Sequence, residues 1–160
     1  KKLCNILPSL QKCHRILVHS IDDLNNLKDI GLIDNVCLFP HGFLDFAKAG
    51  VLNFDESWFE VLKNTFDNSN PDLSSDSMEE INKEDLISKL TKSLNISIAY
   101  ETKMMKEEYA MLWSSSFAKS MEGGKFFWNV GTTVTQSTFD HCYVAVLGSK
   151  MAYILIEDED

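Results

Sequence analysis

"FFWNVGTTVTQSTFDHCYVAVLGSKMAYILI", residues 126–156, decides the fold that we expect for the larger part of the chain. From residue 126 to 130 the side chains alternate in a period of two, which is typical of a β-strand. Residues 143–147 and 151–156 are apolar runs joined by a short connection that begins at Gly148, the pattern of a β-hairpin. These segments predict a three-stranded antiparallel meander.

A helix is predicted upstream of this meander. Apolar residues recur every fourth position from Phe54 to Phe66, and this spacing marks one face of a helix that begins at Asn53 or Asp55. The segment that follows, residues 67–77, is polar and contains a proline, so we expect it to form a loop.

A second helical region is expected between this loop and the first predicted strand. Ser77 and Glu80 form a capping-box pattern at its start, and the double glycine at Gly123 ends it. Because an uninterrupted helix of ~40 residues is rare in a compact domain, we expect two helices with a kink or turn near residues 93–101.

The first 50 residues predict a separate strand-helix-strand unit. The short apolar runs 16–18 and 36–39 are candidate buried strands, with a helix between them that begins at Ser20 and ends at Gly31. The predicted fold class is therefore α+β: this unit, then helices, then the meander. We expect two parts, a βαβ-like segment at 1–50 and an acidic α+β domain at 51–160.

Charge is distributed unevenly between these two parts. Residues 1–50 hold six Lys/Arg and five Asp/Glu, a net of +1, whereas residues 51–160 hold nine Lys and nineteen Asp/Glu, a net of −10. Arg15 is the only arginine. Phosphate binding by nucleic-acid-binding proteins depends on clustered cations, so the larger part is not expected to bind nucleic acid.

Membrane insertion and metal binding are not expected either. No apolar run approaches the roughly 20 residues that a bilayer span needs. The four cysteines contain no CxxC pair, and this is typical of reduced thiols in a cytoplasmic protein. The sequence predicts no metal site and no cofactor.

Residues 10–42, "LQKCHRILVHSIDDLNNLKDIGLIDNVCLFPHG", resemble a stretch of the group 1 (family 4) retaining glycosyltransferases. The matching pieces are RILVHS, DDLNNLK, GLIDNV and PHG, and the resemblance covers about a fifth of the chain. It implies a two-domain enzyme with a nucleotide-sugar donor, in which this stretch lies near the junction of the two Rossmann-like halves. It also implies that Pro40, His41 and Gly42, which fall on the family's Pro-His/Asn-Gly element, lie close to the substrate.

The rest of the chain departs from that family. A glycine-rich donor loop, a basic pair for the diphosphate and a carboxylate motif are all missing after Gly42. We therefore expect a glycosyltransferase-related polypeptide that does not transfer sugar as this chain alone. A truncated or fused relic, a fragment of a longer polypeptide and a chance local likeness all remain open.

The alternative hypothesis is a non-catalytic acidic protein that binds a basic protein partner, such as a toxin-immunity protein, an antitoxin or a secretion chaperone. The net charge of residues 51–160 motivates it, because complementary charge steers association. Aromatic anchors and terminal carboxylates are the candidate contacts, with core packing as the other explanation for the aromatic residues. These candidates are Trp113, Phe126, Trp128, Asp158, Glu159 and Asp160.

Overall fold

The structure, a computed structural model, describes residues 47–96, 98, 101 and 107–158. The strand-helix-strand unit predicted near the start of the chain lies outside these residues, as does the stretch that resembles glycosyltransferases. No helix in the described ranges is long and apolar enough to cross a membrane.

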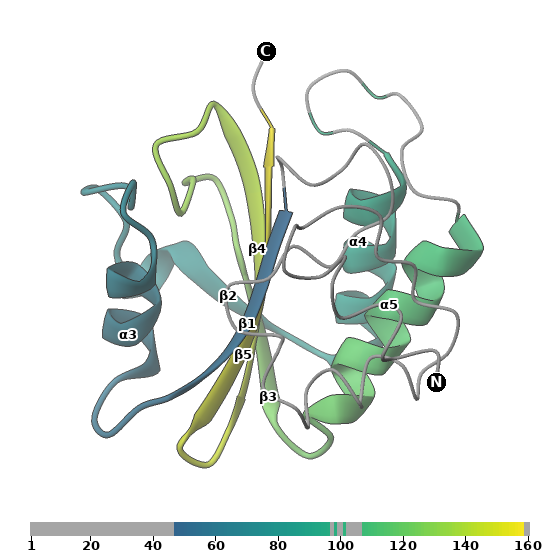
Figure 1. Cartoon of the computed structure of the whole chain (residues 1–160), viewed down its shortest axis with the longest axis horizontal. Coiled ribbons are helices and arrows are strands. Elements are labelled where there is room, and N and C mark those ends of the chain that lie inside the picture. Colours follow the sequence, from purple (N-terminus) through teal and green to yellow (C-terminus); the bar gives the residue numbers. More distant parts are fainter. Residues whose placement is uncertain (1–46, 97, 99–100, 102–106, 159–160) are drawn as a thin grey trace, which may run out of the picture.

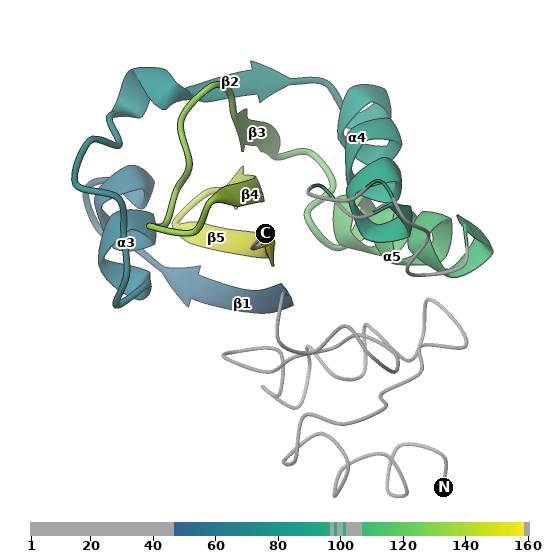
Figure 2. The same cartoon turned by 90° about the horizontal axis from the view of Figure 1, so that it is seen from above.

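The described part is a mixed α+β fold built on one antiparallel sheet, with strand order β1-β5-β4-β3-β2. Helix α3 covers one face of the sheet, and helices α4 and α5 cover the other (Figures 1 and 2). The strands are β1 (Ala47–Asn53), β2 (Met78–Ile81), β3 (Lys125–Asn129), β4 (Phe139–Leu147) and β5 (Lys150–Asp158). The helices are α3 (Trp58–Thr65), α4 (Lys83–Asn95) and α5 (Glu107–Ser120), with a 3₁₀ turn at Ser75–Ser77.

The predicted three-stranded meander is wrong, because the sheet has five strands. Strands β3, β4 and β5 do pair in sequence order, but β1 pairs with β5 and β2 pairs with β3 at the two edges. Val51 lies opposite Ala152, and Glu80 lies opposite Phe127. Partners so distant in sequence leave no local pattern, and this is why both edge strands escaped prediction. The boundary expected between residues 50 and 51 falls within β1.

The prediction that a helix begins at Ser77 is also wrong. Ser77 ends the 3₁₀ turn, and the residues after it form edge strand β2. Helix α4 begins later, where the Asn82 side chain accepts a hydrogen bond of 2.7 Å from the backbone N–H of Asp85. The predicted break is confirmed, because α4 ends at Asn95 and α5 is a separate helix.

Helix α3 begins four residues inside its predicted range. Ser57 is its N-cap, in place of Asn53 or Asp55, and its hydroxyl accepts from the backbone N–H of Glu60 at 3.4 Å. Asn53 belongs to strand β1, so its backbone is extended and paired with β5. The sheet therefore determines how early this helix can begin.

One core lies between the sheet and helices α4 and α5. Leu86, Leu90 and Leu94 recur every four residues along α4, and none of them is exposed. Trp113 from α5 and Tyr143 from β4 complete the centre of this core. The apolar spacing that predicts a helix here also selects the face that is buried.

A second core lies between the sheet and helix α3. Leu62 and Phe66 face Val144 and Tyr153, and the rings of Phe66 and Tyr153 meet edge to face at 5.3 Å. Val144 follows Tyr143 directly but packs on the opposite face. Because both faces of β4 and β5 are covered, their sequences are almost continuously apolar.

The connection between β3 and β4 is held by a buried carboxylate. Asp140 accepts hydrogen bonds from the backbone N–H groups of Val134 and Thr135, from the Thr135 hydroxyl and from the Asn129 amide, at 2.7 to 2.9 Å. Burial raises the pKa of Asp140, and these hydrogen bonds oppose that rise. The connection is thereby fixed close to the site described below.

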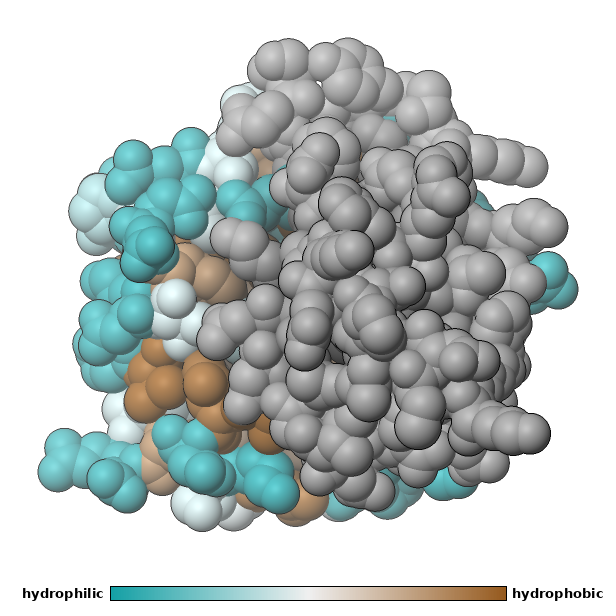
Figure 3. Space-filling view, in the orientation of Figure 1, coloured by the Kyte–Doolittle hydropathy of each residue, from teal (hydrophilic) through white to brown (hydrophobic). Residues whose placement is uncertain are grey.

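The surface of the described part is largely polar on the side of helix α3. Figure 3 shows hydrophilic side chains over α3 and a smaller apolar area along β1. Leu52 of β1 and Phe54 after it are only partly buried and pack against the α3 core. Scattered exposure of this kind is normal for a globular protein.

Replacing Leu90 with alanine should lower the free energy of unfolding by about 2–5 kcal/mol, because the cavity left in a fully packed core has little room to collapse. Urea unfolding followed by circular dichroism measures the change. Met111→Ala, at a position that is 50% exposed on α5, is the matched control and should cost less than about 1 kcal/mol. Equal losses for the two variants would contradict this assignment of the core.

Candidate functional site

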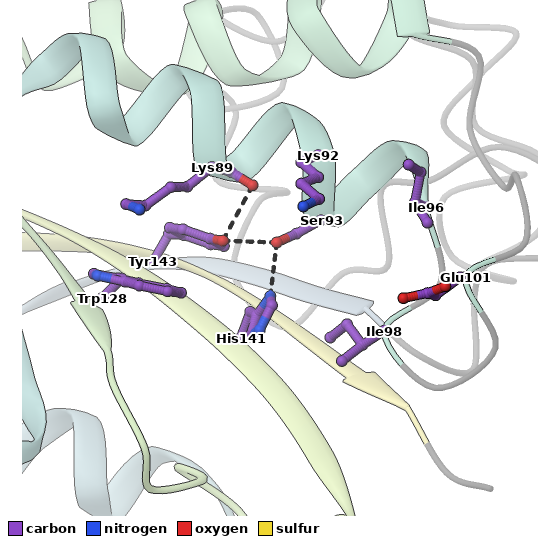
Figure 4. A pocket seen from close by; sticks show the side chains of 9 residues that line it. All are labelled: Lys89, Lys92, Ser93, Ile96, Ile98, Glu101, Trp128, His141 and Tyr143. Carbon is purple, nitrogen blue, oxygen red and sulfur yellow. Dashed lines mark hydrogen bonds between the residues drawn. The ribbon is translucent and has the colours of Figure 1, made fainter.

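A cavity of about 520 Å³ opens between the C-terminal half of helix α4 and strands β3 and β4. This volume falls within the range of roughly 300–1,000 Å³ that is usual for small-molecule sites. Lys89, Lys92 and Ser93 line it from the helix, as Figure 4 shows. They stand at positions i, i+3 and i+4, which share one face of a helix.

The opposite wall comes from the sheet. Trp128 of β3 lies directly across from Tyr143 of β4, and their rings are nearly parallel with centroids 6.1 Å apart. His141 precedes Tyr143 by two residues, so both side chains point to the same face of β4. Its ring meets Trp128 edge to face at 5.6 Å. Ile96 and Ile98 add an aliphatic side.

A chain of hydrogen bonds joins the two walls (Figure 4). The Ser93 hydroxyl lies 2.6 Å from the Tyr143 hydroxyl and 2.7 Å from Nδ1 of His141. The Tyr143 hydroxyl donates to the backbone carbonyl of Lys89 at 3.2 Å. Ser93 is 5% exposed and Tyr143 is fully buried, so each hydroxyl satisfies the other where water is excluded.

The electrostatics of the cavity favour the neutral forms of His141 and Tyr143, and two lysines stand at its rim. Burial, and then the nearby charges of Lys89 and Lys92, lower the pKa of His141 below its ordinary value. Burial raises the pKa of the Tyr143 phenol. The Lys89 ammonium lies 4.7 Å from the centroid of the Trp128 ring, within the range of a cation–π contact.

Glu101 is the acidic side chain among the described residues that line the cavity. It is exposed and holds a left-handed backbone conformation, with φ of 56°. Two lysines and one glutamate thus line the cavity. Its lining is locally cationic, although the protein as a whole is acidic. Within the described ranges, no group of three His, Cys, Asp or Glu side chains is arranged to hold a metal ion.

The Ser93–His141 pair has the composition of a nucleophile and its base. Two features oppose that role. The Ser93 hydroxyl is buried, and it is already bonded to Tyr143 as well as to His141. A nucleophile must reach the substrate with its proton directed at the base, so this arrangement suits a fixed wall of a binding site better than acyl transfer.

The structure places the predicted site residues in three different settings. Trp113 and Phe126 are buried in the core beneath α4 and α5, at 1% and 6% exposure, so neither is available to a partner in the folded state. Trp128 lines the cavity. Asp158 ends strand β5. The other candidates, Pro40, His41, Gly42, Glu159 and Asp160, lie outside the described residues.

Apart from Trp128, sequence reasoning missed the residues that build the cavity. His141 and Cys142 are neighbours on β4 and point to opposite faces of the sheet. Cys142 is buried beneath α3, whereas His141 lines the cavity with α4. The polar positions Lys89 and Ser93 beside the apolar stripe of α4 were the available signal.

Acidification should destabilise the wild-type protein more than a His141→Gln variant. The pKa of His141 in the folded state is lower than its ordinary 6.5, so the unfolded chain binds more protons between these two values. Stability contributed by the neutral imidazole is present above this window and is lost as pH falls through it. Urea unfolding at about pH 7.5 and about pH 5 measures the difference. An identical loss in both proteins would contradict it.

Comparison of the chain with protein-family models, with curated proteins and with solved structures finds no match. The cavity is the feature of the described residues that points to a function. Its main features are the two lysines of α4, the aromatic wall of β3 and β4, and the hydroxyl chain that connects them.

Proposed function

We propose that residues 47–158 form a binding module for a small organic anion, and that the cavity between α4 and the sheet is its site. The observation that supports this most directly is the placement of Lys89 and Lys92 opposite the aromatic wall of Trp128, His141 and Tyr143. Ammonium groups attract an anionic head, and aromatic and aliphatic walls bury an apolar body.

The surrounding charge makes this placement selective. Residues 51–160 carry a net charge of −10, which repels anions from the surface as a whole. Screening at physiological ionic strength limits that repulsion to about 8 Å, whereas contacts inside a cavity are screened much less. An anion that fits between the lysines and the aromatic wall is favoured over one that only approaches the exterior.

Nucleotide sugars are the ligand class that the sequence resemblance adds. A diphosphate supplies the negative charge, and a base supplies a planar group for the aromatic wall. A hollow of about 300 Å³ continues past Trp128 and His141 along the β3–β4 connection, and it offers room for a neutral extension. We propose on this basis a glycosyltransferase-related polypeptide that binds such a donor without transferring its sugar.

Isothermal titration with phenyl phosphate, UDP, GDP and UDP-glucose tests the site. Wild-type protein should bind at least one of these anions, and the double variant Lys89→Gln/Lys92→Gln should bind it at least about tenfold more weakly, because two charge-assisted contacts are lost. Lys83→Gln is the matched control, since Lys83 begins the same helix but pairs with Glu122 at 3.2 Å. If none of the four anions gives heat, or if the control weakens binding equally, the cavity is not an anion site.

A second candidate function is the binding of a basic protein partner. Exposed acidic side chains gather along edge strand β2 and the start of α4, where they are Asp76, Glu79, Glu80, Glu84 and Asp85. Complementary charge at such a surface mainly increases the association rate. A toxin-immunity protein, an antitoxin and a secretion chaperone share this mode of recognition.

For a basic partner captured from the source cells and then purified, Glu79→Lys/Glu80→Lys should slow association at low salt by about tenfold or more. Surface plasmon resonance at low and high salt measures the rate. Asp55→Lys/Glu60→Lys, at exposed positions around the start of α3, is the control with the same change in net charge. Equal slowing by the two pairs would mean that net charge, and not the β2 edge, controls the encounter.

A further inference from the structure

Only one assignment of donors and acceptors satisfies all three hydrogen bonds of the hydroxyl chain beside the cavity. A backbone carbonyl can only accept, so the Tyr143 hydroxyl donates its single hydrogen to Lys89. Ser93 must then donate to Tyr143, and its oxygen is left to accept from His141. Neutral His141 therefore carries its hydrogen on Nδ1, and the lone pair lies on Nε2.

Nε2 of His141 is open to the cavity. This atom has no hydrogen-bond partner among the described residues. The buried side-chain atoms of these residues that lack a partner do not include Nε2, so it is accessible to a ligand. The charged groups that face this ring are Lys89 and Lys92 from α4 and Glu101 from the α4–α5 connection. Strands β3 and β5 place the neutral side chains of Trp128 and Ile156 beside it.

We propose that His141 determines the specificity of this cavity, and that its Nε2 selects oxyanions that bring a proton, with phosphate monoesters as the chemical class. The inference rests on the proposed anion binding and not on the nucleotide-sugar ligand class, because a nucleotide sugar carries no P–OH proton near neutral pH. The P–OH group of a monoester monoanion donates to Nε2. If the proton moves, it leaves the phosphate oxygen and stays on Nε2, while Nδ1 continues to donate to Ser93. The hydroxyl chain needs no rearrangement in either state.

A sulfate monoester is the informative comparison, because it has nearly the same shape and a single negative charge but no proton. Its oxygens would face the lone pair of Nε2, and the two acceptors would repel each other. Phosphate monoesters have a second pKa of about 6, so a large share still carries the proton near that pH. Burial and the nearby lysines lower the pKa of His141 and so favour the neutral ring, which offers a sulfate no compensating charge.

Titration of phenyl phosphate and phenyl sulfate into wild-type protein at about pH 6 tests the proposal. The phosphate should bind about tenfold more tightly, because one partner of a desolvated hydrogen bond is missing in the sulfate complex. At about pH 7.5, where the phosphate is mainly a dianion, its binding should take up close to one proton. Titration in two buffers of different ionisation enthalpy measures that uptake, and phenyl sulfate should show none.

Two variants test whether the preference for phosphate depends on the proton rather than on anion binding in general. His141→Phe keeps an aromatic ring but removes Nε2, so both the preference for phosphate and the proton uptake should disappear. Ser93→Ala frees Nδ1 to act as an acceptor, so the preference should fall while binding persists. Ser115→Ala on α5, at a position that does not line the cavity, should change neither.

The outcomes distinguish this inference from the function on which it rests. Equal affinity for the two esters without proton uptake would overturn the role of His141 and leave anion binding in place. No binding of either ester, or of any other anion tested, would overturn both. The wild-type measurements need no variant, so the proposal remains testable even if His141→Phe fails to fold.

Discussion

The burial of both faces of the β4–β5 hairpin is the constraint on which the rest of the structure depends. Helix α3 covers one face, and α4 with α5 covers the other. Alternate residues of β4 therefore enter different cores, as Tyr143 and Val144 do. A polar atom that is buried on these strands must find a partner inside the protein, since an unpaired buried hydroxyl costs about 1–3 kcal/mol.

Tyr143 shows how this constraint leads to the site. Its ring is needed in the core, but its hydroxyl would be unsatisfied there without the Ser93 hydroxyl and the Lys89 carbonyl. Ser93 in turn holds Nδ1 of His141 and orients the imidazole at the cavity wall. A requirement of packing thus organises polar groups at the cavity, and the positions of Lys89 and Lys92 on the same helix face add positive charge. Stability and the proposed recognition share these residues.

The cavity and the surface carry opposite charge, and each of the two proposed functions uses one of them. The surface around β2 and the start of α4 is acidic, whereas the rim of the cavity carries two ammonium groups against one carboxylate. An acidic exterior favours a basic macromolecule, and a cationic cavity favours a small anion. These features occupy different parts of the described fold, so the two kinds of binding do not compete for the same side chains.

By itself the sequence determined the local elements: the β3–β4–β5 succession, the break between α4 and α5, and the face of α4 that is buried. Each of these follows from a periodicity of side chains within one segment. Tertiary structure alone decided that β1 and β2 complete the sheet, and that Ser93, His141 and Tyr143 meet. Edge-strand pairing and a hydrogen-bonded cavity both join residues about 50 to 100 positions apart. Such contacts arise only when helices pack on a completed sheet, and a pattern read along one segment carries no information about them.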